Sequence, residues 1–425
     1  MPSGQNEVST LSKHDVYFYD LPEVLLFDRA YKKIEKFGSD CLSLQDGSTT
    51  GSFGSSFNVK FPKSGDFATG VSIEFKTPEL VPTGKNPEVA WIAKPGFYFF
   101  ESIRFELTNQ LIEELRPFFM DIYSQLSYVS DKKRLLDEMI GQTMVYTMMS
   151  NGRVVVCTDD GPQVFASRKP EYEVLVPIRF WWTEYTEHAF PIIGTVFNEH
   201  KIIFSWKDAT SCYILRGEDA KLQETPQLKD VKVYLDVIFL NPATRARLLK
   251  TEWKTPMRQI QYGTKSIKEA EQSVELDINK PVYEILYAVQ EDAATATGVQ
   301  RFDWYDQYTG NELMKPKPGI KSVIFVADST PRYEGRGRKF GNRYVPFKHH
   351  TGGTDQKTPG TICFAQKPED WRPTGAYTLT QVPSKSLKVK FENLSSTNTG
   401  TFHYASLSYG IFKTHKSYGG SAYIN

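Results

Sequence analysis

The sequence predicts an all-β protein made of antiparallel sandwiches, and three observations carry this prediction. Aromatic side chains make up 14% of the 425 residues, with 28 Phe and 23 Tyr, and such side chains favour pleated, half-buried surfaces. Apolar and polar residues alternate through several segments, which is typical of strands with one buried face. Clusters of Gly, Pro, Asn and Ser separate these segments, which favours sandwiches over a parallel α/β sheet. The length predicts two or three domains of about 100–200 residues each.

Four strands can be placed from the alternation. Residues 102–107, 231–240 and 387–391 each put apolar side chains on one face and polar side chains on the other. In residues 231–240 the polar face becomes apolar towards the end, which predicts burial on both sides there. In the fourth strand, near the C-terminus, the residues expected to share a buried face are Ala405, Leu407, Tyr409 and Ile411.

Two helices are expected among the strands. Apolar residues spaced by three and four between 111 and 126 predict a helix that covers at least residues 115–126. A second helix should begin at Asn241-Pro242, because Asn is a preferred N-cap and Pro suits the first helical position. It follows a strand directly and lies near the middle of the chain. We therefore expect it to connect two domains.

Residues 291–318 and 331–358 are expected to be long loops. Loops of this length in a compact β protein are usually functional or form interfaces. In the second loop, residues 332–343 combine basic and aromatic side chains, which suits contacts with nucleic acid. A solvated loop, or arginines paired with acids across a subunit interface, is the favoured alternative because the chain is nearly neutral. The basic residues of this loop are Arg332, Arg336, Arg338, Lys339 and Arg343.

Charge and cysteine content exclude several classes of protein. The chain has 51 Lys and Arg against 50 Asp and Glu, which excludes a polybasic coat, an acidic tail protein and a largely disordered chain. No stretch approaches the ~18 uninterrupted apolar residues of a transmembrane helix, and no secretory signal is visible. The four cysteines make no disulfide framework and are expected to be reduced and mostly buried, as in cytosol. They are Cys41, Cys157, Cys212 and Cys363.

No catalytic, cofactor-binding or metal-binding residue is expected. His349 and His350 are adjacent, and neighbouring residues of a strand point to opposite faces, so they should not share a metal. The sequence contains no nucleophile elbow, phosphate-binding loop or dinucleotide-binding glycine pattern. Asp303 and Asp306 form a weak glycosidase candidate, since acids near aromatics are common on surfaces. The sequon at Asn393 matters only in the secretory pathway.

A set of segments, in chain order, carries a family resemblance. The most specific is Val176-Pro177-Ile178-Arg179-Phe180-Trp181-Trp182, and the Leu235–Asn241 strand is followed by Arg245 and Arg247. The other segments are residues 15–17, 61–66, 103–113, 189–193, 197–200, 279–285, 364–369, 373–375 and 418–425. Together they resemble the double jelly-roll major capsid protein of nucleocytoplasmic large DNA viruses, the iridovirus, phycodnavirus and marseillevirus group. The family's usual Gly-Gly hairpin is replaced by Thr108-Asn109, so a different turn type is expected there.

The resemblance implies two consecutive eight-stranded jelly rolls with a few short helices in loops and the linker. It places an N-terminal arm at residues 1–26 on the inner side of the capsid, jelly roll 1 at 27–241, a linker helix at 242–257 and jelly roll 2 at 258–425. The polar start of the arm and its aromatic patch at Tyr17, Phe18 and Tyr19 suggest that it docks on neighbouring or minor capsid proteins.

The resemblance also implies a structural protein without enzymatic activity or cofactor. It would form homotrimeric, pseudo-hexagonal capsomers that tile an icosahedral shell assembled in the host cytoplasm. The implied partners are neighbouring capsomers, minor capsid proteins and an inner viral membrane beneath the shell, with no specific nucleic acid. The alternatives are a β-sandwich protein for glycan binding or attachment, and a jelly-roll enzyme.

Overall fold

The computed structural model describes residues 36–44, 51–142, 145–150, 153–158, 165–292, 319–353, 359–380, 382–392 and 399–422. The predicted arm at 1–26, the acid pair Asp303 and Asp306, and the sequon at Asn393 lie outside them. Within the described ranges, no helix is long and apolar enough to cross a membrane.

Two antiparallel sheets form a first sandwich around one core. The first sheet has the order β1 (Phe37–Ser43), β13 (Lys229–Leu240), β3 (Phe67–Thr77) and β10 (Phe190–Pro191), with β9 (Tyr172–Pro177) also paired to β3. The second has the order β2 (Ser56–Lys60), β11 (His200–Trp206), β5 (Phe100–Leu107) and β6 (Gln110–Leu115). Two further ribbons pair β4 (Pro82–Trp91) with β12 (Tyr213–Leu222), and β7 (Val145–Ser150) with β8 (Arg153–Thr158).

A second sandwich repeats the strand order of the first. Its larger sheet runs β14 (Lys254–Ile267), β22 (Gly400–His415), β16 (Pro281–Glu291) and β19 (Gly360–Cys363), with β20 (Tyr377–Thr378) on β16 and β23 (Tyr418–Ala422) on β22. Its smaller sheet runs β15 (Glu271–Glu275), β21 (Lys385–Glu392), β17 (Gly319–Ala327) and β18 (Thr330–Arg332). Thus β1-β13-β3 corresponds to β14-β22-β16, and β2-β11-β5-β6 corresponds to β15-β21-β17-β18. The prediction of antiparallel sandwiches is confirmed.

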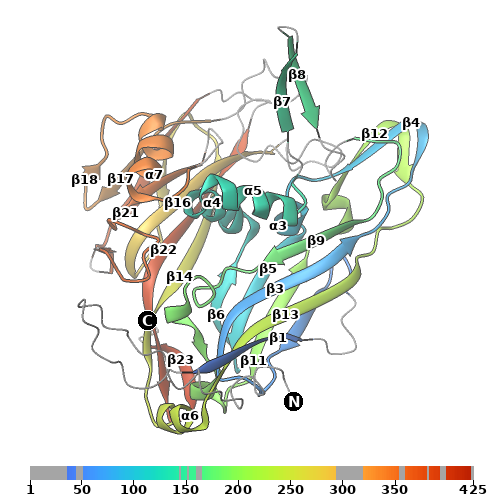
Figure 1. Ribbon diagram of the computed structural model, residues 1–425. Coiled ribbons are helices and arrows are strands. Elements are labelled where there is room, and N and C mark those ends of the chain that lie inside the picture. The colour runs from blue at the N-terminus through green and yellow to red at the C-terminus, as the bar shows by residue number, and fades with distance from the viewer. Residues whose placement is uncertain are drawn as a thin grey trace.

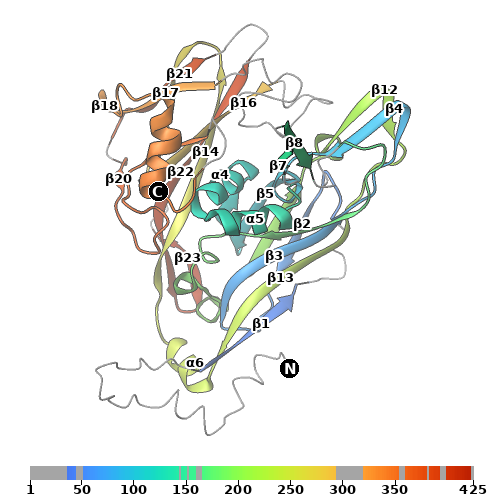
Figure 2. The same cartoon turned by 45° about the horizontal axis from the view of Figure 1, so that its top comes forward.

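The sandwiches lie side by side, with the helices of residues 95–98, 117–127 and 130–139 between them (Figures 1 and 2). The helices are α3 (Pro95–Tyr98), α4 (Pro117–Ser127), α5 (Ser130–Met139), α6 (Pro242–Leu248) and α7 (Val345–His349), the last preceded by a π-helical turn at Phe340–Tyr344. Short 3-10 turns are η1 (Thr186–His188), η2 (Ile192–Thr195) and η3 (Ala209–Ser211). Nearly every residue of α4 is buried, because this helix packs between the two halves.

Two of the four predicted strands have the expected faces throughout. On β13 the second face was expected to be buried towards the end, but Ile238 and Leu240 are only half-buried, and β22 departs from its prediction near its end. On β5, the inward residues Ile103, Phe105 and Leu107 are at most 1% exposed. On β22, Ala405 and Leu407 are buried as predicted, but Ile411 is 41% exposed and Phe412 is fully buried. The strand continues past the core of its own sandwich, and there its other face meets Trp181 and Phe190 of the first half.

Both predicted helices are present, and the one expected to begin at Asn241-Pro242 starts there. The Asn241 side chain accepts a hydrogen bond from the Thr244 N–H at 2.8 Å. The helix predicted to cover at least residues 115–126 is α4. It begins two residues later than predicted, because Pro117 starts it and forces the preceding residue into an extended conformation, so Leu115 ends β6. Helix α5 was not predicted, because Leu136 is its only buried residue.

Residues 331–358 were expected to be a long loop, and this expectation is wrong in part. Residues 340–349 are helical. The glycines of this segment suggested a loop. Gly341 instead allows the helix backbone to lie close to Tyr287, because a Cβ at this position would lie 2.0 Å from the Tyr287 hydroxyl.

Two-residue turns of non-glycine residues close corresponding hairpins of the two sandwiches. Thr108 and Asn109 join β5 to β6 with φ of 46° and 65°, and Asp328 and Ser329 join β17 to β18 with φ of 46° and 66°. Positive φ at both positions is the type I′ geometry, which Gly-Gly also favours. Thr108 therefore adopts a positive φ, which a β-branched residue tolerates poorly. Its hydroxyl offsets the strain by accepting from Asn198 Nδ2 at 3.0 Å and from the Glu199 N–H at 3.2 Å.

Ser329→Gly is expected to raise the free energy of unfolding by about 0.5–1 kcal/mol, because glycine removes the strain of a left-handed residue at some cost in chain entropy. Thr108→Gly should bring no gain, since it also removes two hydrogen bonds. Urea unfolding of both variants checks this. Equal effects of the two substitutions would show that the Thr108 hydroxyl does not offset the strain.

Candidate functional site at the junction of the two sandwiches

A buried arginine joins the two halves of the chain. Arg258 lies on β14 of the second sandwich and is 6% exposed. Its Nε donates to Glu113 Oε1 on β6 at 2.9 Å, and its Nη2 donates to the Arg179 carbonyl oxygen at 2.6 Å. Its Nη1 pairs with Glu184. The second sandwich is therefore held to two segments of the first, strand β6 and the stretch from Arg179 to Glu184.

The acids around Arg258 have further donors. The Trp181 N–H donates to Glu113 Oε2 at 2.8 Å, and the Tyr123 hydroxyl donates to Glu184 Oε2 at 3.1 Å. Burial raises the pKa of Glu113 to about 7, against the opposing effect of Arg258. A buried charge cluster is tolerated only when its members are paired and hydrogen-bonded. These contacts therefore fix the angle between the sandwiches.

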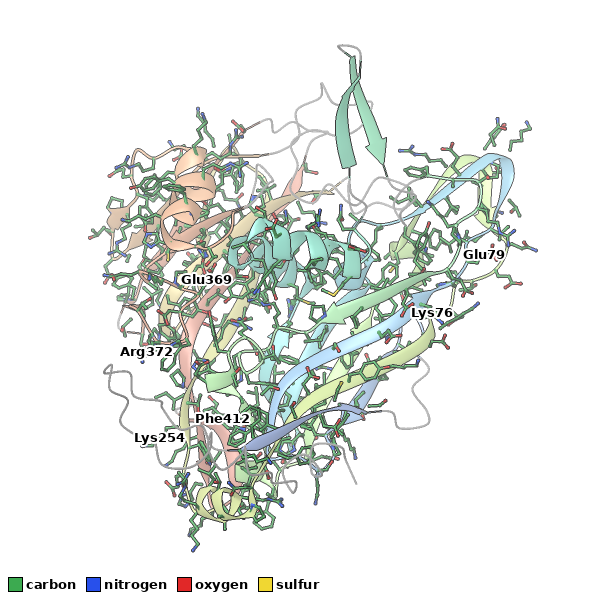
Figure 3. All side chains as sticks on the ribbon, in the orientation of Figure 1. Lys76, Glu79, Lys254, Glu369, Arg372 and Phe412 are labelled. Atoms are coloured by element: carbon green, nitrogen blue, oxygen red, sulfur yellow. The ribbon has the colours of Figure 1, made fainter. Side chains whose placement is uncertain are left out.

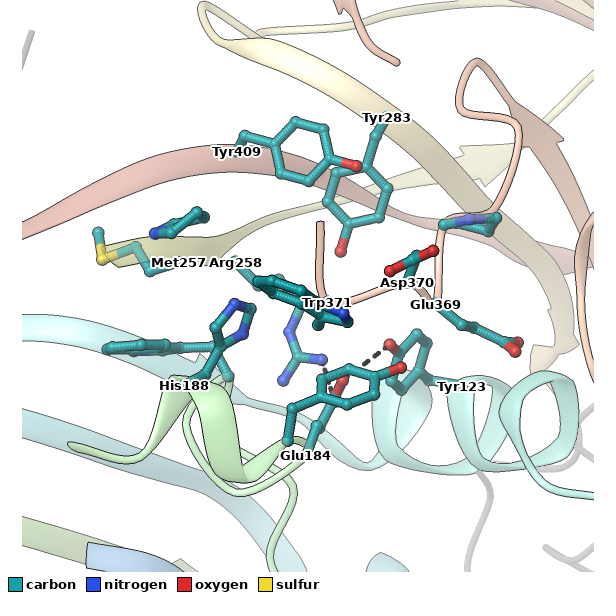
Figure 4. Close-up of a pocket in the computed structure, with 14 residues that line it drawn as sticks. Tyr123, Glu184, His188, Met257, Arg258, Tyr283, Glu369, Asp370, Trp371 and Tyr409 are labelled. Atoms are coloured by element: carbon teal, nitrogen blue, oxygen red, sulfur yellow. Dashed lines mark hydrogen bonds and ion pairs between the residues drawn. The ribbon is translucent and has the colours of Figure 1, made fainter. Parts of the chain in front are cut away.

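A narrow cleft opens beside this cluster (Figure 4). It encloses about 430 Å³, including its open mouth. Its walls bring aromatic side chains of both halves together: Trp181, Tyr185, His188, Tyr283, Trp371 and Tyr409. Two of its carboxylates are already used within the chain, since Glu184 pairs with Arg258 and Glu369 with His350. The cleft is thus part of the packing between the halves.

A buried histidine forms a second charge cluster, in the second sandwich. The His350 side chain is fully buried, with Nε2 2.8 Å from Glu284 Oε1 and Nδ1 2.8 Å from Glu369 Oε1. Burial opposes a charged ring here, but attraction to Glu284 and Glu369 outweighs it and raises the pKa of His350 to about 10. The cluster ties the end of α7 to β16 and to the segment after β19, where Figure 3 labels Glu369.

A third buried contact connects two of the segments that carry the family resemblance, residues 61–66 and the stretch from Leu235 to Arg245. Asp66 follows Gly65, whose φ is +100°, and its carboxylate is buried. It accepts a hydrogen bond from the Leu240 N–H at 2.8 Å and lies 2.9 Å from Arg245 Nε on α6. The aspartate of one segment thus fixes the end of β13 and the start of the helix that leads to the second sandwich.

The basic residues of 332–343 interact mainly within the chain. Arg338 pairs with Glu392 at 2.7 Å, and Arg336 lies over the Phe340 ring at 5.1 Å. Arg332 lies over the rings of Phe364 and Tyr377. The sequence favoured a solvated loop or arginines paired with acids across a subunit interface over contacts with nucleic acid. Arg338 does pair with an acid, but its partner Glu392 belongs to the same chain.

The structure shows where both adjacent histidines and three of the four cysteines lie. His349 and His350 lie at the end of α7 rather than on a strand, and His349 Nδ1 is 2.9 Å from the Gln366 carbonyl oxygen. They therefore have different partners. Among the described residues, no group of three His, Cys, Asp or Glu side chains is arranged to hold a metal. Cys212 and Cys363 are buried free thiols, and Cys41 is an exposed one.

Sequence reasoning singled out His350 only as a poor metal ligand, and it did not single out the other residues of the two charge clusters. Glu113, Arg179, Glu284 and Glu369 stand in segments quoted for the resemblance, but no role was assigned to them. One sequence feature could have pointed to them: each is an ionisable residue that stands within an apolar strand or beside aromatic residues. Arg258 lies in a strand that was not predicted.

Comparison with known proteins gives a consistent result. The family described as "Major capsid protein N-terminus" matches residues 25–241. The major capsid protein of Phaeocystis pouchetii virus is 21% identical, with all of both chains covered, and probable capsid protein 4 of Acanthamoeba polyphaga mimivirus is 20% identical over 100% of this chain and 99% of the relative.

Solved structures agree on the fold. The Faustovirus major capsid protein has a TM-score of 0.78 at 11% identity, covering 92% of this chain and 93% of that one. The PBCV-1 capsid protein has a TM-score of 0.73 at 16% identity, covering 94% and 100%. The family match covers half of the chain, and the fold extends over nearly all of it. The chain therefore belongs to the major capsid protein family of large DNA viruses and is a structural, non-enzymatic component of the virion.

Proposed function

We propose that three copies of the chain form a trimeric capsomer whose six sandwiches approximate a hexagon. The observation that carries this proposal is the repeated strand order of the two halves, held at a fixed angle by the Arg258 cluster. Two similar units per chain in a closed threefold ring supply six similar edges. Such tiles would cover an icosahedral shell through contacts with neighbouring capsomers.

The division of the chain follows the same proposal. Residues 27–241 form jelly roll 1, residues 242–257 the linker and residues 258–425 jelly roll 2, with an N-terminal arm at 1–26 on the inner side of the capsid. Strand β13 ends at Leu240 and α6 ends at Leu248, which supports a connection in this region, and β14 already begins at Lys254. Minor capsid proteins and an inner membrane are the proposed partners beneath the shell.

Assembly in the host cytoplasm is part of the proposal. The free thiols of Cys41, Cys212 and Cys363 support folding in a reducing compartment.

We expect the purified protein to be a trimer at micromolar concentration. Size-exclusion chromatography with light scattering should give about three times the 48.5 kDa of the chain. The measurement is repeated at several salt concentrations, because exposed ion pairs weaken as salt rises. A monodisperse species near 48.5 kDa under all conditions would contradict the trimer.

A further inference from the structure

An exposed apolar patch lies at the end of the molecule where α6, η2 and β23 meet, at the bottom of Figure 1. Its centre is the pair Phe197 and Tyr418, which are 65% and 56% exposed with ring centroids 5.3 Å apart. Val196 follows η2, Leu249 follows α6 and Ile411 lies on β22, which are elements that contact one another here, and all three residues are exposed. We call these five residues the base patch. A gathering of exposed apolar side chains marks an interaction surface more often than isolated ones do.

The base patch is held by both halves of the chain. The Phe197 N–H donates to the Ser417 carbonyl oxygen at 3.2 Å, and the Gly419 N–H donates to Asn198 Oδ1 at 2.7 Å. Tyr418 pairs with His415 across the β22–β23 hairpin. The two aromatic rings are thus presented by fixed backbone.

The surroundings of the base patch are strongly basic. Residues 241–254 and 411–420 contain six Lys or Arg, of which Arg245 already pairs with Asp66, and one carboxylate, Glu252, which pairs with His415. The six are Arg245, Arg247, Lys250, Lys254, Lys413 and Lys416. This end of the molecule therefore suits an occupant that is both apolar and acidic.

The chain itself contains such a segment. Residues 15–28 carry four carboxylates and no Lys or Arg. They also contain nine large apolar side chains, among them Tyr17, Phe18 and Phe27. In both charge and hydrophobicity this segment complements the base patch.

Connectivity places the segment within reach. Phe37, at the start of β1, pairs with Leu240, which is next to the N-cap of α6. The chain thus enters β1 beside the base patch. The seven residues between Asp28 and Lys36 span at most about 25 Å. A short tether of this kind gives an effective concentration in the millimolar range.

We propose that residues 15–28 pack against the base patch of the same molecule, with apolar side chains on the patch and carboxylates facing the surrounding Lys and Arg. This goes beyond the proposed function and does not depend on the trimer. It differs from docking on a neighbouring or minor capsid protein, because the tether favours the patch of the same chain.

Hydrogen exchange with mass spectrometry on the full chain tests the proposal. Peptides from residues 15–28 should exchange at least about tenfold more slowly than a free peptide of that sequence, because docking protects amides from solvent. Phe197→Ser with Tyr418→Ser should remove this protection. The matched control is Tyr344→Ser with Phe347→Ser, an exposed aromatic pair at α7, which should leave it unchanged. Free exchange in the wild type, or unchanged protection in the first variant, would overturn the proposal.

Charge reversal provides a second test. Lys413→Glu with Lys416→Glu should lower the protection of residues 15–28, and adding Asp20→Lys with Glu23→Lys should restore it. Carbodiimide cross-links between Asp20 or Glu23 and these lysines should form within one chain when isotope-labelled and unlabelled protein are mixed. Cross-links between chains would overturn docking in the same molecule. Flotation of the wild type with phosphatidylserine vesicles, lost in the Phe197 and Tyr418 variant, would assign the patch to a membrane instead.

Discussion

Replacing Arg258 by methionine is expected to lower the free energy of unfolding by about 3–5 kcal/mol, because it leaves the buried Glu113 without its cation and Glu184 with only Arg179, 3.7 Å away. Glu113 and Glu184 would keep their buried positions, while methionine fills most of the volume of the arginine stem. Urea unfolding measures the loss. The trimer should weaken in parallel, because the angle between the sandwiches would no longer be fixed.

The matched control for Arg258→Met is Arg168→Met. Arg168 pairs with Glu79 on an exposed flank of the first sandwich, where Figure 3 labels Glu79, and an exposed pair contributes at most about 1 kcal/mol. Adding Glu113→Gln and Glu184→Gln to Arg258→Met should recover part of the loss, since the uncompensated charges are then gone. If both arginine variants lose the same stability, the Arg258 cluster does not hold the halves together.

The stability of the protein should fall between pH 6.5 and 10, and His350 should account for a separable part of that fall. The pKa of His350 rises from 6.5 to about 10 on folding. Its protonation therefore stabilises the native state fully below pH 6.5, and this contribution disappears as the pH rises through 10. The difference between these pKa values corresponds to at most roughly 5 kcal/mol.

Comparing the variant His350→Gln with the wild type isolates this contribution from other titrating groups. At pH 6 the variant should be several kcal/mol less stable, and near pH 10 the two proteins should converge, as judged by urea unfolding at each pH. The matched control is His415→Gln, because His415 pairs with Glu252 on the surface, and it should follow the wild-type curve. Parallel curves for wild type and His350→Gln would rule out a charged His350.

The sequence predicted the sandwiches because alternation is a local signal. A strand with one buried and one solvent-exposed face needs an apolar residue at every second position, and residues 103–107 of β5 meet that requirement. The same reasoning was wrong at Ile411, because β22 continues past its own sandwich and exchanges its buried face there. A single strand does not encode which neighbour covers it.

The charge clusters were not predictable in the same way. Arg258 and Glu113 are 145 residues apart, and His350 meets Glu284 and Glu369 from three separate segments. An arginine or glutamate on a strand is read from sequence as a solvent-facing residue, since unpaired burial is too costly. Only the packed structure supplies the partner that makes burial tolerable.

The sequence alone determined the all-β class, the helix start at Asn241 and, through its ordered segments, the family. Each of these depends on residues close together in the chain: alternation, a cap or a short motif. Tertiary structure alone decided the angle between the sandwiches, the buried clusters that fix it and the position of the base patch. These depend on contacts between residues far apart in the sequence, which exist only after both sandwiches have folded and packed against each other.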